Sequence, residues 1–113
     1  MTIKWVKVDA LVMNGEPFCY NTRLTVLNLL QMRSQGLTPR EILAFHPELR
    51  RVGIAEAYRY AAEHRERYAR FFEADGSLRG PGYTPDEAAA LPAHLRELHG
   101  VVVTPSGREP APA

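Results

Sequence analysis

Residues 37–47 have the sequence LTPREILAFHP, which carries a start signal and a stop signal for a short helix. Thr38 is a favoured N-cap residue, and Pro39 fits the first helical position, where its missing N–H costs nothing. The glutamate three residues after Thr38 completes a capping box. Pro47 disfavours helical geometry at the residue before it, so we predict a helix of about two turns that ends near residue 45.

Helices are also predicted on both sides of this segment. Apolar residues recur at helical spacing over residues 24–32, after the candidate cap Thr22 and before Gly36, a typical helix stop. Residues 53–74 contain no proline and no glycine beyond their first position, and their apolar residues form an interrupted stripe. We predict that this third helix is the longest of the three.

The first 21 residues are expected to form a small β element. Residues 3–8, IKWVKV, alternate between apolar and basic side chains, which is typical of an extended arm with exposed lysines. Apolar residues at 11–13 and 18–20 bracket the sequence NGEP, and an Asn-Gly pair readily takes the positive φ angles of a tight turn. We therefore predict a hairpin formed by residues 11–13 and 18–20.

Residues 76–113 are predicted to be less compact, because they contain six of the nine prolines. The sequence GSLRGPGY at 76–83 is typical of a flexible linker. Residues 84–98 begin with a second Thr-Pro start signal and predict a helix that is kinked at Pro92. Residues 104–113 are expected to be disordered.

These patterns predict a mainly α protein of 113 residues with one core. Its centre is a three-helix, homeodomain-like helix-turn-helix bundle at residues 22–75. A small N-terminal β-hairpin at residues 1–21 precedes the bundle, and a C-terminal extension at residues 76–113 follows it. In such a unit the second helix braces against the DNA backbone, so that the start of the third helix can enter the major groove.

On this frame the candidates for DNA binding gather around the start of the third helix. The residues expected to face the groove are Arg50, Arg51, Ala55, Glu56 and Arg59, and the candidates for phosphate contacts are Arg23 and Arg40. Residues 20–72 contain nine arginines and five glutamates, a net charge of 9 − 5 = +4, whereas the remainder carries 5 − 8 = −3. The alternative explanation is an ordinary solvated helical surface rich in Arg and Glu.

Several short motifs together resemble a known family. They are Gly15-Glu16-Pro17, Asn21-Thr22-Arg23, Gly36-Leu37-Thr38-Pro39, Glu41-Ile42-Leu43 and Tyr60-Ala61-Ala62, with Val26, Leu29-Leu30, Pro47, Leu49 and Ala57 between them. As a set they resemble the domain-of-unknown-function 433 family, over residues 10 to 63.

The resemblance implies a homeodomain-like bundle preceded by a small β element, in proteins that are often dimeric. Members of the family resemble VapB-type antitoxins and are often encoded beside a PIN-type ribonuclease toxin. By this analogy the protein would be a homodimer that binds operator DNA and represses its own toxin–antitoxin operon. Residues 76–113 would then bind the toxin.

The sequence departs from the family pattern at two places. Asn21 stands where the family usually has Gly, and Asn tolerates a positive φ angle better than most residues. Residues 50–53, Arg-Arg-Val-Gly, replace the usual Leu-Thr-x-Glu/Asp, which puts two cations where the helix dipole favours an acid. Either a phosphate compensates for these charges or the helix starts later.

The sequence offers little support for an enzyme. The four histidines do not pair at helical spacing, and the chain has no glycine-rich phosphate loop and no hydrolase or metalloprotease motif. We therefore expect no catalysis, metal or cofactor. Cys19 is the only cysteine, which excludes an intramolecular disulfide and a cysteine-rich zinc site, and it is expected to be a small buried hydrophobe.

Location and partners are also constrained by composition. The chain has no apolar run long enough to span a membrane and no signal-peptide pattern, so we expect a protein of the reducing cytoplasm. Aromatic residues between 58 and 72 alternate with arginines and could stack on single-stranded bases, although core and dimer contacts are the favoured explanation. A second hypothesis for the whole chain is a dimeric protein-interaction module that binds no DNA, with residues 76–113 wrapped around a partner.

Overall fold

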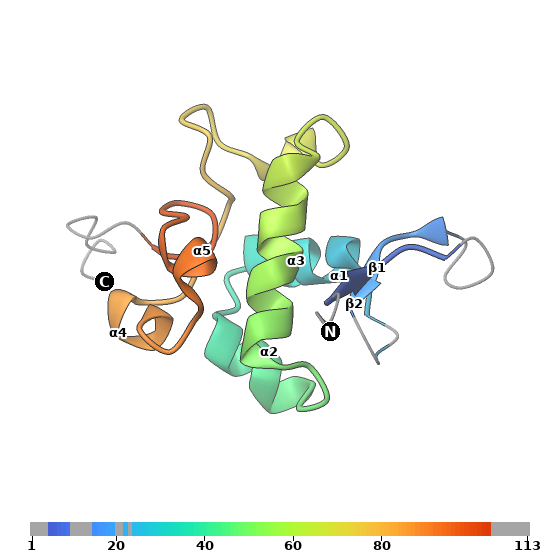
Figure 1. Cartoon of the computed structure of the whole chain (residues 1–113). Helices are drawn as coiled ribbons and strands as arrows, with labels where there is room; N and C mark the ends of the chain where they lie inside the picture. The colour runs from blue at the N-terminus through green and yellow to red at the C-terminus, as the bar shows by residue number, and fades with distance from the viewer. Residues whose placement is uncertain (1–4, 10–14, 20–21, 23, 105–113) are drawn as a thin grey trace.

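The computed structural model describes residues 5–9, 15–19, 22 and 24–104, and it shows a mainly α protein with a small two-stranded sheet. The elements are β1 (Val6–Lys7), β2 (Phe18–Cys19), α1 (Val26–Ser34), α2 (Pro39–Phe45), α3 (Arg51–Glu63), the 3₁₀ helix η2 (Ala69–Phe71), α4 (Pro85–Ala88) and α5 (Ala93–Arg96). In Figure 1, α3 crosses in front of α1, with the β-hairpin on one side and α4 and α5 on the other. The mainly α fold with an N-terminal hairpin agrees with the prediction.

Helix α1 starts later than the sequence suggested. Its N-cap is Thr25, whose hydroxyl accepts a hydrogen bond from the backbone N–H of Asn28 at 3.0 Å. The Asn28 side chain accepts from the Thr25 N–H in return, so the two residues form a capping box. Thr22, the predicted cap, instead accepts from the Leu24 N–H and donates to the Cys19 carbonyl, and thereby fixes the turn before the helix.

Helix α2 confirms the prediction at both ends. The hydroxyl of Thr38 accepts from the Glu41 N–H, and a Glu41 carboxylate oxygen accepts from the Thr38 N–H at 2.9 Å. Pro39 occupies the first helical position, and the helix ends at Phe45 before the His-Pro pair. The signals for the start and the end of this helix lie within ten residues of one another, so they determine its limits without tertiary contacts.

Helix α3 is shorter than predicted. It ends at Glu63, and the chain then turns through residues 64–68 into η2. Tyr68 and Phe71 are buried on this path, and η2 contacts α1. A straight helix would carry both rings past the end of the bundle, so burial of apolar surface favours the turn.

The hairpin has a different pairing from the one expected. β1 and β2 are antiparallel, with Val6 opposite Cys19 and Lys7 opposite Phe18. The partner of residues 18–19 is therefore the arm at residues 6–7. The predicted strand at residues 11–13 lies outside the described residues.

The C-terminal extension is part of the fold. Its buried side chains are Leu78, Tyr83, Ala88, Leu91, Leu95, Val102 and Val103. The segment expected to be a flexible linker thus contributes two core residues, Leu78 and Tyr83. Tyr83 reaches the start of α3, where its hydroxyl donates to the Arg51 carbonyl. The helix predicted at 84–98 is split into α4 and α5, and Pro92 caps the second of them.

One buried arginine joins the extension to the bundle. Arg33 of α1 is only 2% exposed, and its guanidinium lies 4.6 Å from the ring centre of Tyr58 in α3. Its Nε donates to the Gly80 carbonyl at 3.3 Å, and its Nη1 donates to the Val101 carbonyl. Burial lowers the pKa of Arg33 from 12.5 to about 10.

Gly80 allows the chain to pass over Arg33. Its φ is +88°, and a Cβ atom there would lie 1.9 Å from the Arg33 carbonyl oxygen. Gly82 is also tightly placed, since a Cβ would lie 2.6 Å from the Val102 carbonyl oxygen. Two glycines in the sequence GSLRGPGY therefore serve close packing rather than flexibility.

We expect Gly80→Ala to destabilise the protein more than Gly36→Ala. Gly36 has a similar φ of +99°, but a Cβ atom there would have no neighbour within 4 Å, so its substitution tests backbone strain alone, at about 1–2 kcal/mol. The clash at Gly80 should add about 1–3 kcal/mol to the loss in free energy of unfolding, measured by urea denaturation. Equal losses for the two variants would show that the extension does not pack tightly on Arg33.

Candidate nucleic-acid interface

Two exposed arginines mark the start of α3. Arg50 is the N-cap residue, makes no side-chain cap hydrogen bond, and is followed by Arg51 in the first turn. Neither side chain has an ion-pair partner within the part of the chain that the structure describes. The first turn of α3 has no acidic residue, so the positive end of the helix dipole carries two further positive charges.

Of the two residues expected to contact phosphates, Arg40 and Arg23, the structure describes only Arg40. Arg40 is the second residue of α2, its side chain is 85% exposed, and its Nε lies 4.0 Å from a carboxylate oxygen of Glu87 in α4. An exposed pair at this distance contributes little energy, so Arg40 remains accessible to an anion. Arg23 lies outside the described residues.

Ala55 does not face a groove. Its exposed fraction is 0%, because α3 is covered on two sides and its buried residues span more than one stripe. The placement of Ala55 among the base-contacting residues was therefore wrong. If only one face of α3 were covered, residue 55 would be exposed to solvent. The C-terminal extension covers a second face of this helix.

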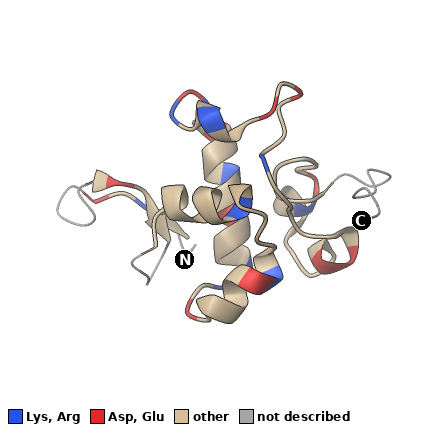
Figure 2. Cartoon of the chain, turned by 180° about the vertical axis from the view of Figure 1, so that it is seen from behind, with Lys and Arg blue, Asp and Glu red and all other residues tan. Residues whose placement is uncertain are grey.

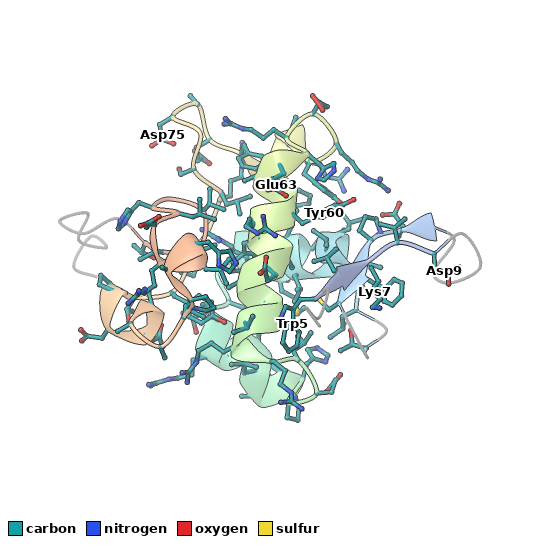
Figure 3. All side chains as sticks on the ribbon, viewed as in Figure 1. Trp5, Lys7, Asp9, Tyr60, Glu63 and Asp75 are labelled. Atoms are coloured by element: carbon teal, nitrogen blue, oxygen red, sulfur yellow. The ribbon has the colours of Figure 1, made fainter. Side chains whose placement is uncertain are left out.

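The outward side of α3 carries a chain of ion pairs. Arg59 Nε donates to Glu56 Oε1 at 2.6 Å, and Arg59 Nη1 donates to Glu63 Oε2 at 2.9 Å. The hydrogen bond that Arg59 donates to Glu56 is the largest contribution that raises the pKa of Arg59. Figure 3 shows Tyr60 and Glu63 on the upper half of α3. With two acids to one base, the middle of the helix offers no excess positive charge.

Glu56 also holds the C-terminal extension. Its second oxygen, Oε2, lies 2.9 Å from Nε2 of His94 in α5, and the Glu56 side chain is only 12% exposed. The Tyr83 hydroxyl donates to the Arg51 carbonyl at 2.8 Å, close to the start of α3. Of the predicted groove residues, Glu56 and Arg59 are thus brought together, while Arg50 and Arg51 lie at the end of the helix.

Sequence reasoning missed Arg33, Tyr83 and His94 as organising residues. A signal existed for Arg33, because it continues the apolar stripe of α1 after Leu29 and Leu30. No local signal marked the other two. Their roles depend on contacts across more than thirty positions of the chain.

The structure also bears on three other possibilities, which are a metal site, base stacking on the aromatic residues and a membrane-spanning helix. No three His, Cys, Asp or Glu side chains of residues 5–9, 15–19, 22 and 24–104 lie together as a metal site. Tyr58, Tyr68 and Phe71 are buried, so the aromatic stripe is largely core. No helix among the described residues is long and apolar enough to cross a membrane.

The fold is a small helical bundle with a C-terminal extension that contains the short helices α4 and α5. The model of a family described as "Protein of unknown function (DUF433)" matches residues 6–61, which are the hairpin, α1, α2 and all but the last two residues of α3. The chain belongs to the DUF433 family. The comparison with curated proteins finds no match, and neither does the comparison with solved structures.

Cys19 is buried in β2, and desolvation raises the pKa of its thiol from 9.0 to about 12. A thiol with this pKa stays protonated at neutral pH, so it is a poor nucleophile. Burial also raises the pKa of Tyr58 and Tyr68 to about 12, from 10.0, and raises that of Tyr83. The folded protein therefore holds protons that the unfolded chain releases above pH 9.

We expect Cys19→Ala to reduce the loss of stability in mild alkali. Because the folded pKa of Cys19 is raised, its contribution is complete below pH 9 and is lost as the pH rises toward 12. Between pH 9 and pH 10 the variant should lose about 1 kcal/mol less free energy of unfolding than the wild type. Parallel curves of stability against pH would show that the thiol is not held protonated by the fold.

Proposed function

We propose that the protein binds duplex DNA through the end of the bundle formed by the start of α3 and the start of α2. The observation that carries this proposal is the pair Arg50 and Arg51, exposed and without a carboxylate partner among the described residues. Two cations at a helix N-terminus are unfavourable in isolation, and a phosphate would remove the repulsion. Arg40 belongs to α2, which lies at the end of the molecule where α3 starts (Figure 1).

The order and lengths of α1, α2 and α3 support a helix-turn-helix role. The outward side of α3 suits only limited base recognition, because both carboxylate oxygens of Glu56 are engaged by Arg59 and His94, whereas the half-exposed Glu63 can accept a hydrogen bond from cytosine N4. Arg59 is held between these two acids, so it is positioned but largely neutralised. Phosphate contacts then supply most of the affinity, and base contacts supply modest specificity.

The biological setting that we propose follows the family resemblance. The protein would be a cytoplasmic, dimeric, antitoxin-like repressor of its own operon, and a PIN-type ribonuclease toxin would be its partner. Residues 76–104 would meet the toxin with their outer surface, because unfolding them would expose seven core side chains. Each large apolar side chain contributes about 1.5–3 kcal/mol by burial, so opening the extension is costly.

A second candidate function is a protein-interaction module that does not bind DNA. Phe45 at the end of α2 is 71% exposed, and Val8 beside β1 is 59% exposed. Large exposed apolar side chains on a small domain favour contact with another chain, including a second copy of this one. A toxin complex or homodimer that forms without any DNA affinity would favour this candidate.

We expect Arg50→Ala/Arg51→Ala to weaken DNA binding and its salt dependence. The test fragment is the region upstream of the gene, where we expect protection of a near-palindrome. Loss of two phosphate contacts should reduce the slope of log K against log salt by about 2. Arg96→Ala, which removes one exposed arginine from α5, is the control and should leave the slope unchanged.

Wild-type protein that binds upstream and random DNA equally would contradict the repressor role. An unchanged slope in the double variant would contradict the assignment of Arg50 and Arg51. Neither result depends on the identity of a toxin.

A further inference from the structure

A second group of exposed arginines lies at the opposite end of α3. Arg65, Arg67 and Arg70, which we call the distal arginine cluster, lie in the turn after α3 and in η2. Figure 2 shows blue segments at this end of the molecule, with red segments beside them. The cluster is separate from Arg50 and Arg51, which lie at the other end of the helix.

Each arginine of the cluster lies over an aromatic ring. The distances from guanidinium carbon to ring centre are 5.0 Å for Arg65 over Phe72 and 4.9 Å for Arg70 over Phe71. Arg67 lies 5.8 Å from the ring centre of Tyr68. Stacking on a ring holds a planar guanidinium in place, so less side-chain entropy is lost when it binds an anion.

Two of the three arginines form no ion pair among the described residues, with Glu66 the acidic neighbour between Arg65 and Arg67 in the sequence. Arg67 forms an ion pair with Glu16 at 3.2 Å. Arg65 and Arg70 are exposed and form no ion pair within residues 5–9, 15–19, 22 and 24–104. These two residues are therefore free to pair with an external anion.

The spacing of the two cationic ends fits one particular partner. Helix α3 has 13 residues, which corresponds to a length of about 20 Å. The major groove of B-form DNA is about 12 Å wide and is bordered by a phosphate backbone on each side. A helix of this length reaches from one border to the other, with its nearly neutral middle over the bases.

We propose that the distal arginine cluster contacts the phosphate backbone on the far side of the groove from Arg50 and Arg51. Arg65 and Arg70 make these contacts, and the helix is fixed to the duplex at both ends. This inference rests on the proposed function. It adds a second contact surface, beyond the family-matched segment, and it predicts that α3 lies across the groove.

Single-stranded nucleic acid is the less suitable ligand for this surface. Stacking of bases requires open aromatic faces, whereas Tyr68 and Phe71 are only 3% and 7% exposed. The cluster presents guanidinium groups rather than rings. Charge pairing with phosphates is therefore the interaction that it supports.

The test is the salt dependence of binding to a random-sequence duplex, measured by fluorescence anisotropy with the full chain. Arg65→Ala/Arg70→Ala should reduce the slope of log K against log salt by about 2, with weaker binding at every salt concentration. Arg65→Lys/Arg70→Lys keeps both charges and should keep the wild-type slope. Arg96→Ala is the control for loss of an exposed arginine elsewhere.

The outcomes separate the inference from the proposed function. A wild-type slope in the alanine variant, while Arg50→Ala/Arg51→Ala loses its slope, would overturn the distal contact and leave DNA binding intact. Wild-type protein without affinity for the duplex would overturn both. An equal loss in the lysine and alanine variants, with unchanged melting temperatures, would also overturn the inference, because charge would not be its cause. Loss confined to a single-stranded probe would do the same.

Discussion

The burial of Arg33 is the constraint on which the rest of the structure depends. Its guanidinium stacks on Tyr58 of α3 and donates to carbonyls on both arms of the C-terminal extension, at Gly80 and Val101. One side chain of α1 thereby connects three parts of the chain that are distant in sequence. The position of the extension then decides which side of α3 is covered and which side remains exposed to solvent.

A buried cation without a nearby carboxylate is expensive to desolvate, and its lowered pKa reflects that cost. Charge-assisted hydrogen bonds to carbonyl groups and the ring of Tyr58 offset part of it. Few other positions of the extension are compatible with this burial, because a displaced extension would leave the Arg33 guanidinium without hydrogen-bond acceptors. Close packing at Gly80 limits the alternatives further. The arginine therefore contributes to the specificity of the fold more than to its stability.

The features that could be predicted are those whose causes are local. The limits of α2 follow from a cap, a proline at the start and a proline after the end. Exposure of Arg50 and Arg51 could be predicted because they precede the apolar stripe of α3. The end of α3 could not, because it depends on the contact of η2 with α1. The burial of Ala55 could not either, because it depends on the extension, which contacts the bundle across separations of up to 68 residues. The start of α1 illustrates the same point on a smaller scale, since two threonines compete for the cap there and the geometry of the preceding strand selects the second.

The match to the family ends at residue 61, whereas the hydrophobic core continues to Val103. The segment shared with the family is therefore not the unit that folds. A fragment cut at residue 61 would retain Arg33 and Tyr58 but would leave the arginine without its carbonyl acceptors and α3 with an apolar side in water. Aggregation is the expected fate of such a surface. Any recombinant shortening of this protein should therefore take the boundary from the core, after Val103, and not from the family alignment.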